Sequence, residues 1–320
     1  MKKIGIGLDL GGTTMLAAAV SEDGRILKQK IRETPSREKA KIVLSSIVDL
    51  LKLVENWSLS ENLEIVGIGL GLPGLVNFTT GVVELMPNFP KMRGFPIIDE
   101  LKKYFDYKLF YENDANAALL GEYRFGAGKG VDDLICFTIG TGIGGAVLID
   151  GKLLRGPEGF AGELGHITLD PDGPLCGCGN RGCLEALASS SAIVRRAKEI
   201  ISEGKIKTLL SNYLEREEEL NASIIAEEAN KGDLLAQKVY EETGKWLGIA
   251  IGSLANIFNI YLFLIGGGVA SAGDVLFKPM IDETFKRAMP GIREKIKIDR
   301  FKLGNDAGVI GASTLPFYNN

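Results

Sequence analysis

The feature that most constrains the fold of this chain is a unit that occurs twice. Residues 4–25 contain an apolar strand, the glycine turn GGTT, a second strand and a Glu-Asp-Gly turn. Residues 134–151 repeat that order, with the glycine turn GTG between the strands and an Asp-Gly turn after them. This self-similarity indicates an internal duplication. A chain of 320 residues is long enough for two domains, and we expect one copy in each.

Both glycine turns have the composition of a phosphate site. Gly11 and Gly12 follow the first strand, and residues 140–142 follow its repeat. Backbone N–H groups exposed at such turns can bind phosphate oxygens, and a nearby carboxylate such as Asp9 can hold Mg²⁺ through water. A tight turn that only requires glycine is the competing interpretation for each turn alone. Because the unit is duplicated, we favour two turns that bind the phosphates of one nucleotide.

A third glycine turn follows another apolar strand. Residues 260–265 lead into Gly267 and Gly268 and then toward a helix. Glycine at such a position permits close approach of a nucleotide base or ribose. The pattern is weak on its own, so it is interpreted only as a candidate site for the nucleoside.

Composition and charge restrict the possible partners. The chain is 45% hydrophobic and 24% charged, a balance typical of globular proteins. Its net charge of −4 gives no electrostatic support for a nucleic-acid partner. The N-terminus leads directly into strand-like sequence, and no apolar run reaches the length of a membrane span. We therefore expect a soluble, cytoplasmic protein with neither nucleic-acid nor membrane partners.

Residues 159–185 form a segment rich in glycine and cysteine. It contains the only histidine, His166, and three of the four cysteines, Cys176, Cys178 and Cys183. One imidazole and three thiolates complete a tetrahedral ligand set for structural Zn²⁺. Three thiols cannot all pair in disulfides, and thiols that only fill space would not explain the glycines between them. We predict that these four residues bind one zinc ion.

Two carboxylates flank this predicted zinc site. Glu163 precedes His166 by three residues, and Glu185 follows Cys183 by two. A metal bound between them would hold both acids and the second imidazole nitrogen in a fixed arrangement. Acceptors on several sides suit a small ligand rich in hydroxyl groups. Since no coordination position stays open, we expect the zinc to be a scaffold without a direct part in the chemistry.

The segment Glu112-Asn113-Asp114 stands between a strand and an alanine-rich helix. Asn and Asp are common N-cap residues, so a cap alone is the simplest interpretation. Two adjacent caps would be redundant, however, and ligands in α/β folds bind at the carboxyl ends of strands. One of the two side chains can therefore cap the helix while the other faces a ligand.

The remaining periodicity predicts further helices and strands. We expect helices over residues 36–55, about 97–104, 184–201, about 224–231, 234–254 and 306–318, and strands over 63–70 and 108–111. The predicted domains are a small one over residues 1–115 and a large one over 116–305 that carries the zinc site. The C-terminal helix, about 306–320, is expected to pack back on the small domain.

Together these segments resemble a known family. The stretches IGIGLDLGGTT, ENDANAA, FTIGTGIGGAVLIDGK, GELGH and CGCGNRGCLE are similar to those of the ROK family of sugar kinases and sugar-responsive repressors, and most similar to its ATP-dependent glucokinases. The resemblance covers essentially the whole chain. It implies an actin-like/hexokinase-like ATPase fold, in which two α/β domains have a deep cleft between them.

The resemblance also implies roles for individual residues. Asp114 would be the catalytic base, and the other sugar-binding residues would be Asn88, Asn113, Glu163, His166 and Glu185. The phosphates of ATP would lie at Gly11, Gly12, Thr13 and Thr14 and at Gly140, Thr141 and Gly142, with the nucleoside near Gly267 and Gly268. Thr14 stands where many members carry lysine or asparagine, and Lys91-Met92 where many carry a tryptophan.

These implications lead to a specific expected activity. We expect an ATP:hexose 6-phosphotransferase that acts on glucose, uses catalytic Mg²⁺ held by Asp9, and forms a homo-oligomer, a dimer or a tetramer. Fructose, mannose, N-acetylmannosamine or allose is the alternative substrate, and polyphosphate an alternative donor. A sugar-responsive DNA-binding repressor is the rival from another class. Repressors need a recognition helix, and the first strand at Ile4 leaves no room for one.

Overall fold

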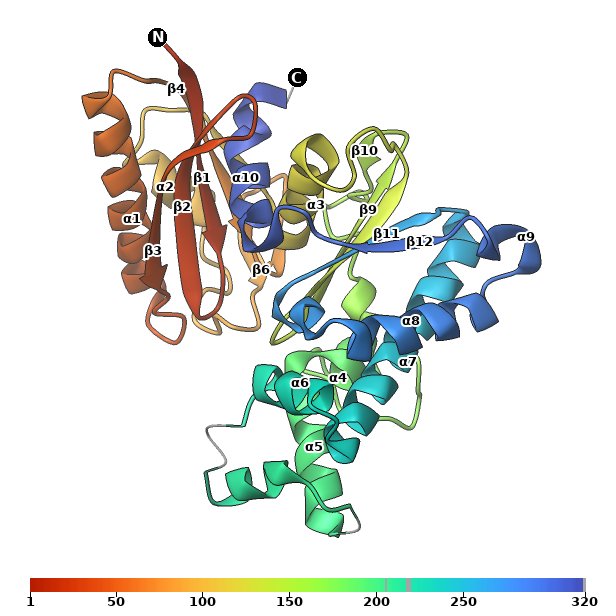
Figure 1. Ribbon diagram of the computed structural model, residues 1–320. Coiled ribbons are helices and arrows are strands. Elements are labelled where there is room, and N and C mark those ends of the chain that lie inside the picture. Colours follow the sequence, from red (N-terminus) through yellow and green to blue (C-terminus); the bar gives the residue numbers. More distant parts are fainter. Residues whose placement is uncertain (205, 217–219, 319–320) are drawn as a thin grey trace. The chain divides into compact units, whose positions relative to one another are not determined.

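The computed structural model describes residues 1–204, 206–216 and 220–318. The described chain divides into two compact units. Unit 1 comprises residues 1–132, 146–162 and 301–320, and unit 2 comprises residues 133–145 and 163–300. Each unit is described by itself (Figure 1).

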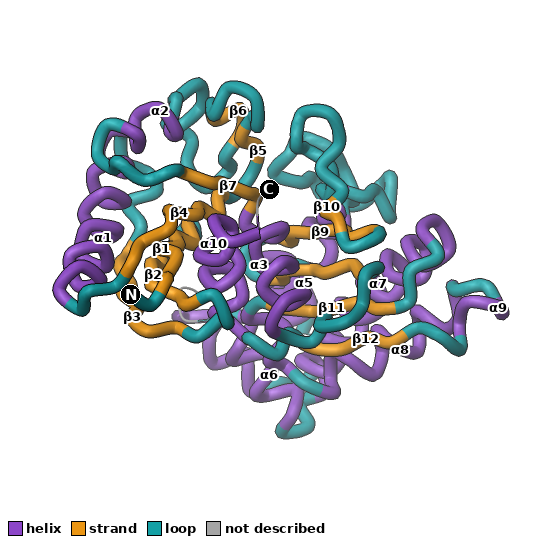
Figure 2. Tube along the Cα trace, turned by 90° about the horizontal axis from the view of Figure 1, so that it is seen from above, coloured by secondary structure: helices purple, strands orange, loops and turns teal. Residues whose placement is uncertain are grey.

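Unit 1 is built on a five-stranded mixed sheet of order β3-β2-β1-β4-β7 (Figure 2). The predicted strand–turn–strand unit is confirmed, because β1 (Lys3–Leu10), β2 (Thr14–Ser21) and β3 (Ile26–Glu33) pair antiparallel in series. β4 (Glu64–Leu72) and β7 (Leu109–Asn113) run parallel to β1. Their register places Asp9 opposite Gly71, and Gly71 opposite Glu112. The carboxyl ends of β1, β4 and β7 therefore lie side by side.

Helices cover both faces of this sheet (Figure 1). α1 (Ala40–Ser60) buries an apolar stripe on one face; it begins after the predicted residue 36, because Pro35 starts a turn closed by the Glu38 N–H. α3 (Asp114–Phe125) and α10 (Ala307–Tyr318) cover the other face. Glycines in the strands allow α10 to approach closely, since a Cβ at Gly69 would lie 1.9 Å from the Ala312 carbonyl oxygen. Smaller elements of unit 1 are β5 (Leu75–Val76), β6 (Val83–Leu85) and α2 (Ile97–Lys102).

The second sheet has the order β10-β9-β8-β11-β12. It contains β8 (Leu134–Ile139), β9 (Ile143–Ile149), β10 (Lys152–Leu153), β11 (Leu262–Gly266) and β12 (Lys297–Arg300), and the boundary between the units falls within β9. β11 runs parallel to both β8 and β12. The duplicated strand, turn and strand thus become β8 and β9, as the sequence predicts. The short strand β12 was not predicted.

Unit 2 also contains a cluster of helices: α4 (Leu184–Ala188), α5 (Ser190–Glu203), α6 (Ala222–Asn230), α7 (Leu234–Phe258), α8 (Asp274–Arg287) and α9 (Pro290–Arg293). The single helix predicted over residues 184–201 is wrong. Ser189 is extended, with φ −70° and ψ 168°, and its side chain caps α5 by accepting the Ala192 N–H. The Ser190 N–H donates to the Gly140 carbonyl instead of continuing α4. The break therefore joins the helices to the second glycine turn.

The unit boundaries differ from the predicted domain boundaries. Residues 116–132 and 146–162 group with unit 1, whereas the prediction assigned them to the domain over residues 116–305. The reason is that α3 packs against α10 and β4 of unit 1. α10 packs on β1, β2 and β4, where the sequence predicts it, although residues 319 and 320 lie outside the described chain. Within the described residues, no helix is both long and apolar enough to cross a membrane.

Candidate functional site

The first candidate residues of unit 1 lie where β1 ends. Asp9 is the next-to-last residue of the strand, and α10 packs directly on it, since a Cβ at Gly308 would lie 2.4 Å from Asp9 Oδ2. Burial, and second the charge of the Asp114 carboxylate, raise the pKa of Asp9 to about 7. Two carboxyl groups therefore interact at one edge of the sheet. A cation near them would favour the ionised form of both.

The turn between β1 and β2 lies against a predicted sugar residue. A Cβ at Gly12 would be 2.7 Å from Asn88 Nδ2, and one at Gly11 would be 2.5 Å from the Thr14 carbonyl oxygen. A Cβ would clash with the protein's own atoms at both positions, so the packing of this turn requires glycine there. Thr13 and Thr14 are exposed at the tip of the turn. Asn88 thus lies beside the first predicted phosphate turn.

The junction of β7 and α3 shows which of Asn113 and Asp114 caps the helix. Asn113 is the N-cap, and its Oδ1 accepts the N–H groups of Ala115 and Asn116 at 2.9 and 3.2 Å. Its Nδ2 donates to the Gly74 carbonyl at 3.3 Å. Asp114 is the first helical residue and accepts the Ala115 N–H at 2.8 Å. The helix terminus therefore does not depend on Asp114 as its cap.

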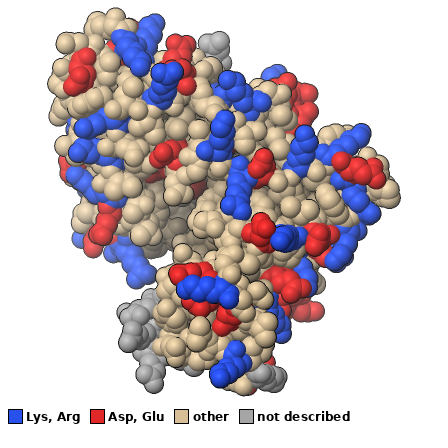
Figure 3. Space-filling model, in the orientation of Figure 1, with Lys and Arg blue, Asp and Glu red and all other residues tan. Residues whose placement is uncertain are grey.

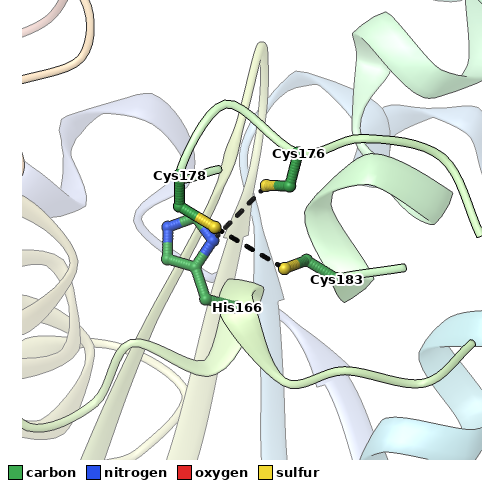
Figure 4. Close-up of side chains that lie close together, drawn as sticks. All are labelled: His166, Cys176, Cys178 and Cys183. Atoms are coloured by element: carbon green, nitrogen blue, oxygen red, sulfur yellow. Dashed lines mark hydrogen bonds between the residues drawn. The ribbon is translucent and has the colours of Figure 1, made fainter. Parts of the chain in front are cut away.

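In unit 2 the four predicted metal ligands meet (Figure 4). Their donor atoms all lie within 4.8 Å of one another, with 3.6 Å between Cys176 Sγ and His166 Nδ1 and 3.7 Å between Cys178 Sγ and Cys183 Sγ. Tetrahedral Zn²⁺ with Zn–S bonds of about 2.3 Å requires sulfur atoms about 3.8 Å apart. The donor set and its spacing therefore fit zinc.

The second nitrogen of His166 faces a carboxylate. Nε2 lies 3.9 Å from Glu163 Oε2, whereas Nδ1 faces the thiols. Burial raises the pKa of Glu163, with His166 opposing that shift and Glu185 adding to it. Glu163 and His166 therefore present an acceptor and a ring nitrogen on the side of the imidazole away from the cysteines.

Glu185 joins the cysteine segment to the second glycine turn. Its Oε2 accepts the Ile143 N–H at 2.9 Å, and its Oε1 lies 3.5 Å from Cys176 Sγ. Ser191 Oγ donates to the Thr141 carbonyl at 3.1 Å. The turn at residues 140–142 is therefore held by the residues that follow Cys183. The sequence offers no signal for these bonds beyond the polar stretch Ser189–Ser191.

Gly267, with φ +83°, directly follows β11, whose last residue, Gly266, pairs with Thr138 near the end of β8. A Cβ on Gly267 would lie 2.4 Å from the Ile139 carbonyl oxygen, so only glycine fits there. A pocket of about 490 Å³ lies near the same sheet edge, lined by Thr141, by Ser190, Ser191, Val194, Arg195 and Lys198 of α5, and by residues 220–222. The α5 residues were not predicted from the sequence as part of a site.

The structure therefore gathers the predicted residues into one group within each unit. Unit 1 holds Asp9, Gly11, Gly12, Thr13, Thr14, Asn88, Asn113 and Asp114; unit 2 holds Gly140, Thr141, Gly142, Glu163, His166, Cys176, Cys178, Cys183, Glu185, Gly267 and Gly268. The glycine turns and the Asn113-Asp114 pair follow the carboxyl ends of β1, β7, β8 and β11, where α/β folds bind ligands.

Comparisons with known proteins identify the relatives of this chain. The ROK family model matches residues 5–317. A glucokinase of Thermotoga maritima is 39% identical over 97% of this chain and 96% of its own length. A xylose repressor of Caldicellulosiruptor bescii is 31% identical over 96% of this chain but 76% of its own length.

A solved structure shows the same architecture. The ROK glucokinase of Streptomyces griseus, in complex with glucose and AMPPNP, aligns with a TM-score of 0.84 and 35% identity, over 98% of this chain and 99% of that protein. The predicted fold class, the actin-like/hexokinase-like ATPase fold with two α/β domains, is confirmed.

Proposed function

The chain belongs to the ROK family, and from this premise we propose that it is an ATP-dependent glucokinase. It would transfer the γ-phosphoryl group of ATP to the 6-hydroxyl of glucose. The observation that carries this proposal is the junction of β7 and α3. There Asn113 caps the helix, and an adjacent carboxylate stands at the carboxyl end of a parallel strand.

Asp114 is the proposed general base. It would accept the proton of the sugar hydroxyl as that oxygen attacks the γ-phosphorus. Its position in the first turn of α3 supports this role, because the positive end of the helix dipole favours the ionised, proton-accepting form. Phosphoryl transfer depends mainly on positioning and charge stabilisation, so one base and two phosphate turns are sufficient machinery.

The proposed sugar-binding residues are Asn88, Asn113, Glu163, His166 and Glu185, together with the base. Support comes from His166, whose Nε2 lies beside Glu163 while its Nδ1 faces the thiols. These side chains offer both donors and acceptors, as a ligand with several hydroxyl groups requires.

The donor ATP would be bound by both glycine turns. The turn at residues 11–14 and the turn at residues 140–142 would contact its phosphates, and Gly267 and Gly268 the nucleoside. Support comes from the tight packing at Gly12 and Gly267, where a Cβ would meet another atom within 3 Å. Mg²⁺, when bound, neutralises phosphate charge. Asp9 is the residue proposed to hold hydrated Mg²⁺. Its raised pKa and its interaction with the Asp114 carboxylate indicate that a cation bound there would be stabilised by negative charge.

Zinc is the proposed structural metal. His166, Cys176, Cys178 and Cys183 would hold it, and it would supply a fixed tetrahedral anchor for the segment between Glu163 and Glu185. We further propose a cytoplasmic homo-oligomer, a dimer or a tetramer. No nucleic-acid partner is proposed.

Two observations weigh against the rivals. The glucokinase relative is 39% identical to this chain and the xylose repressor 31%, which favours the kinase. On the face in Figure 3, Lys and Arg side chains are interspersed with Asp and Glu, which gives no support there for a polyphosphate track. Another hexose remains the second candidate substrate.

A coupled assay over a panel of sugars and donors tests the proposal. We expect the highest kcat/KM with glucose and ATP among glucose, fructose, mannose, N-acetylmannosamine and allose, each with ATP or polyphosphate. A preference for another sugar would keep the kinase and correct its substrate. Binding of sugar without turnover of any of them would favour a regulator instead.

A further inference from the structure

We propose that Glu112 and Arg155 are a positioning pair that ties the residue carrying the proposed base to the loop of residues 154–162. The inference rests on the proposed function for the meaning of its kinetic effects. Its structural part, the tie itself, stands on contacts within unit 1. Neither residue belongs to the predicted sugar, phosphate or metal groups.

Glu112 is a buried carboxylate whose two oxygens accept hydrogen bonds from different groups. Its Oε2 accepts hydrogen bonds from Arg155 Nε and a terminal guanidinium nitrogen, both at 2.8 Å. Its Oε1 accepts the Asn113 N–H at 3.1 Å and the Asn116 side-chain amide at 2.9 Å. Glu112 is 2% exposed. One carboxylate therefore binds the backbone on one side of Asp114, a side chain on the other, and the loop.

The carboxyl end of β7 shows what this tie connects. Three consecutive residues at the end of this strand each bind a different loop. Tyr111 Oη donates to the Phe78 carbonyl at 2.7 Å, Glu112 binds Arg155, and Asn113 donates to the Gly74 carbonyl. The strand end immediately before Asp114 is thus an anchor for three surrounding loops.

The loop of residues 154–162 has little regular structure of its own. Its ends approach through a hydrogen bond from the Ala161 N–H to the Arg155 carbonyl at 3.0 Å. Gly159 packs on the Phe78 ring, where a Cβ would lie 2.1 Å from a ring carbon, and Phe78 stacks on Tyr111. Along the chain, the loop leads directly to Glu163, one of the proposed sugar residues.

Removal of the guanidinium would therefore have two consequences. It would leave the Glu112 carboxylate buried beside amide donors only, an arrangement that costs free energy until the group moves or takes up a proton. It would also release the loop from the strand. Since Glu112 binds groups on both sides of Asp114, its movement would displace the base. A displacement of about 1 Å can reduce turnover about 100-fold.

The test compares Arg155→Ala with Arg287→Ala. Arg287 is a matched control, because it also binds a buried carboxylate, Glu283, at 2.7 Å, but at the end of α8. We expect Arg155→Ala to lower kcat about 10- to 100-fold, while KM for ATP stays within about twofold. Arg155→Lys, which keeps the charge but loses the planar fork, should restore part of kcat. Arg287→Ala should lose stability without a comparable loss of kcat.

Hydrogen exchange on the free protein provides a readout that does not depend on activity. In Arg155→Ala we expect faster exchange of the amides of residues 155–162 and of Asn113, and in Arg287→Ala no change there. If Arg155→Ala does not fold, the double variant Glu112→Gln, Arg155→Met removes both charges and takes its place.

The outcomes separate this inference from the proposed function. Unchanged exchange in a folded Arg155 variant would overturn the tie. Faster exchange with unchanged kcat would overturn the positioning role. A wild-type protein that phosphorylates no sugar would contradict the proposed function, while the exchange comparison would still decide on the tie.

Discussion

The two groups of candidate residues are held in place by different means. In unit 1 they lie at strand ends and at a capped helix terminus, where backbone hydrogen bonds of a sheet and helix hold them. In unit 2, Glu163 and His166 lie in a segment between β10 and α4 with few regular elements, next to the metal-ligand cluster. Regular structure supplies order in the first case, and the proposed zinc supplies it in the second. We therefore expect that substitutions can change the chemistry at Asp114 and the order of the cysteine segment independently of each other.

The largest expected effect comes from Asp114→Asn, which removes the proposed base and leaves the cap intact. Since Asn113 accepts the first N–H groups of α3, the melting temperature should change little. A positioned general base contributes about 10²–10⁴-fold to rate, so kcat should fall by that factor. The measurements are steady-state kinetics with glucose and ATP, and thermal melting.

Asp274→Asn is the matched control for this change. Asp274 is also the first residue of a helix, α8, and its exposed carboxylate pairs with Lys278. Its kcat should equal that of the wild type. Near-normal turnover in the Asp114 variant would require another base, and Glu163 would be the next candidate.

Loss of the proposed metal is expected to act on unit 2 alone. Cys178→Ser removes one of the four ligands, so bound zinc should fall from about one per chain toward none. Glucose affinity should fall about 10- to 100-fold, because Glu163, His166 and Glu185 lose their common anchor. Hydrogen exchange should quicken over residues 163–183 and stay unchanged at the β1–β2 turn.

Cys136→Ala is the control for the loss of a thiol outside the proposed metal site, because Cys136 is buried in β8 and is not one of the four clustered residues. That variant should keep its metal. An active wild type that is well ordered over residues 163–183 with no metal bound would contradict the proposed zinc site.

A smaller effect is expected from valine at each glycine turn. At position 12 the new side chain would meet Asn88, and at position 142 it would meet Glu185 Oε2 at 2.4 Å. KM for ATP should rise about tenfold in each case, an amount that corresponds to about 1.4 kcal/mol. Calorimetry with glucose should show a loss of affinity in both variants, because Asn88 and Glu185 are both proposed sugar-binding residues.

Gly291→Val is the control, since a Cβ there meets nothing within 4 Å and the backbone needs no positive φ. Its nucleotide affinity should match that of the wild type. If Gly142→Val also bound ATP with wild-type affinity, the second turn would not belong to the phosphate site.

The comparison also explains what could be predicted from sequence. The strand–turn–strand repeat was predictable because apolar runs and glycine turns are local signals. The grouping of His166 with the three cysteines was predictable because these are rare residues close together in the chain. The tie between Glu112 and Arg155, the bond from Ile143 to Glu185 and the break at Ser189 were not, because each depends on a partner 42 or more residues away. The grouping of residues into units also depends on distant partners, since α3 packs against α10, at the other end of the chain.

The smallest expected effect is a pH dependence that belongs to unit 1. The pKa of Asp9 is raised to about 7 in the folded protein, above an unfolded value of about 3.9. Between these values the folded state binds more protons than the unfolded state, so the contribution of Asp9 to stability falls as pH rises from about 4 to about 7 and is constant above that. Asp9→Asn removes this pH-dependent contribution to stability. The melting temperature of the variant relative to the wild type should therefore increase by a few degrees between pH 5 and pH 8, measured without divalent cations.

Added Mg²⁺ and ATP should reduce that difference, because a cation near Asp9 lowers its pKa. The Cys178→Ser variant should keep the same pH dependence, since Asp9 and the cysteines lie in different units. An equal pH dependence in Asp9→Asn and wild type would show that Asp9 does not titrate in this range, and would remove the main electrostatic support for its proposed role toward magnesium.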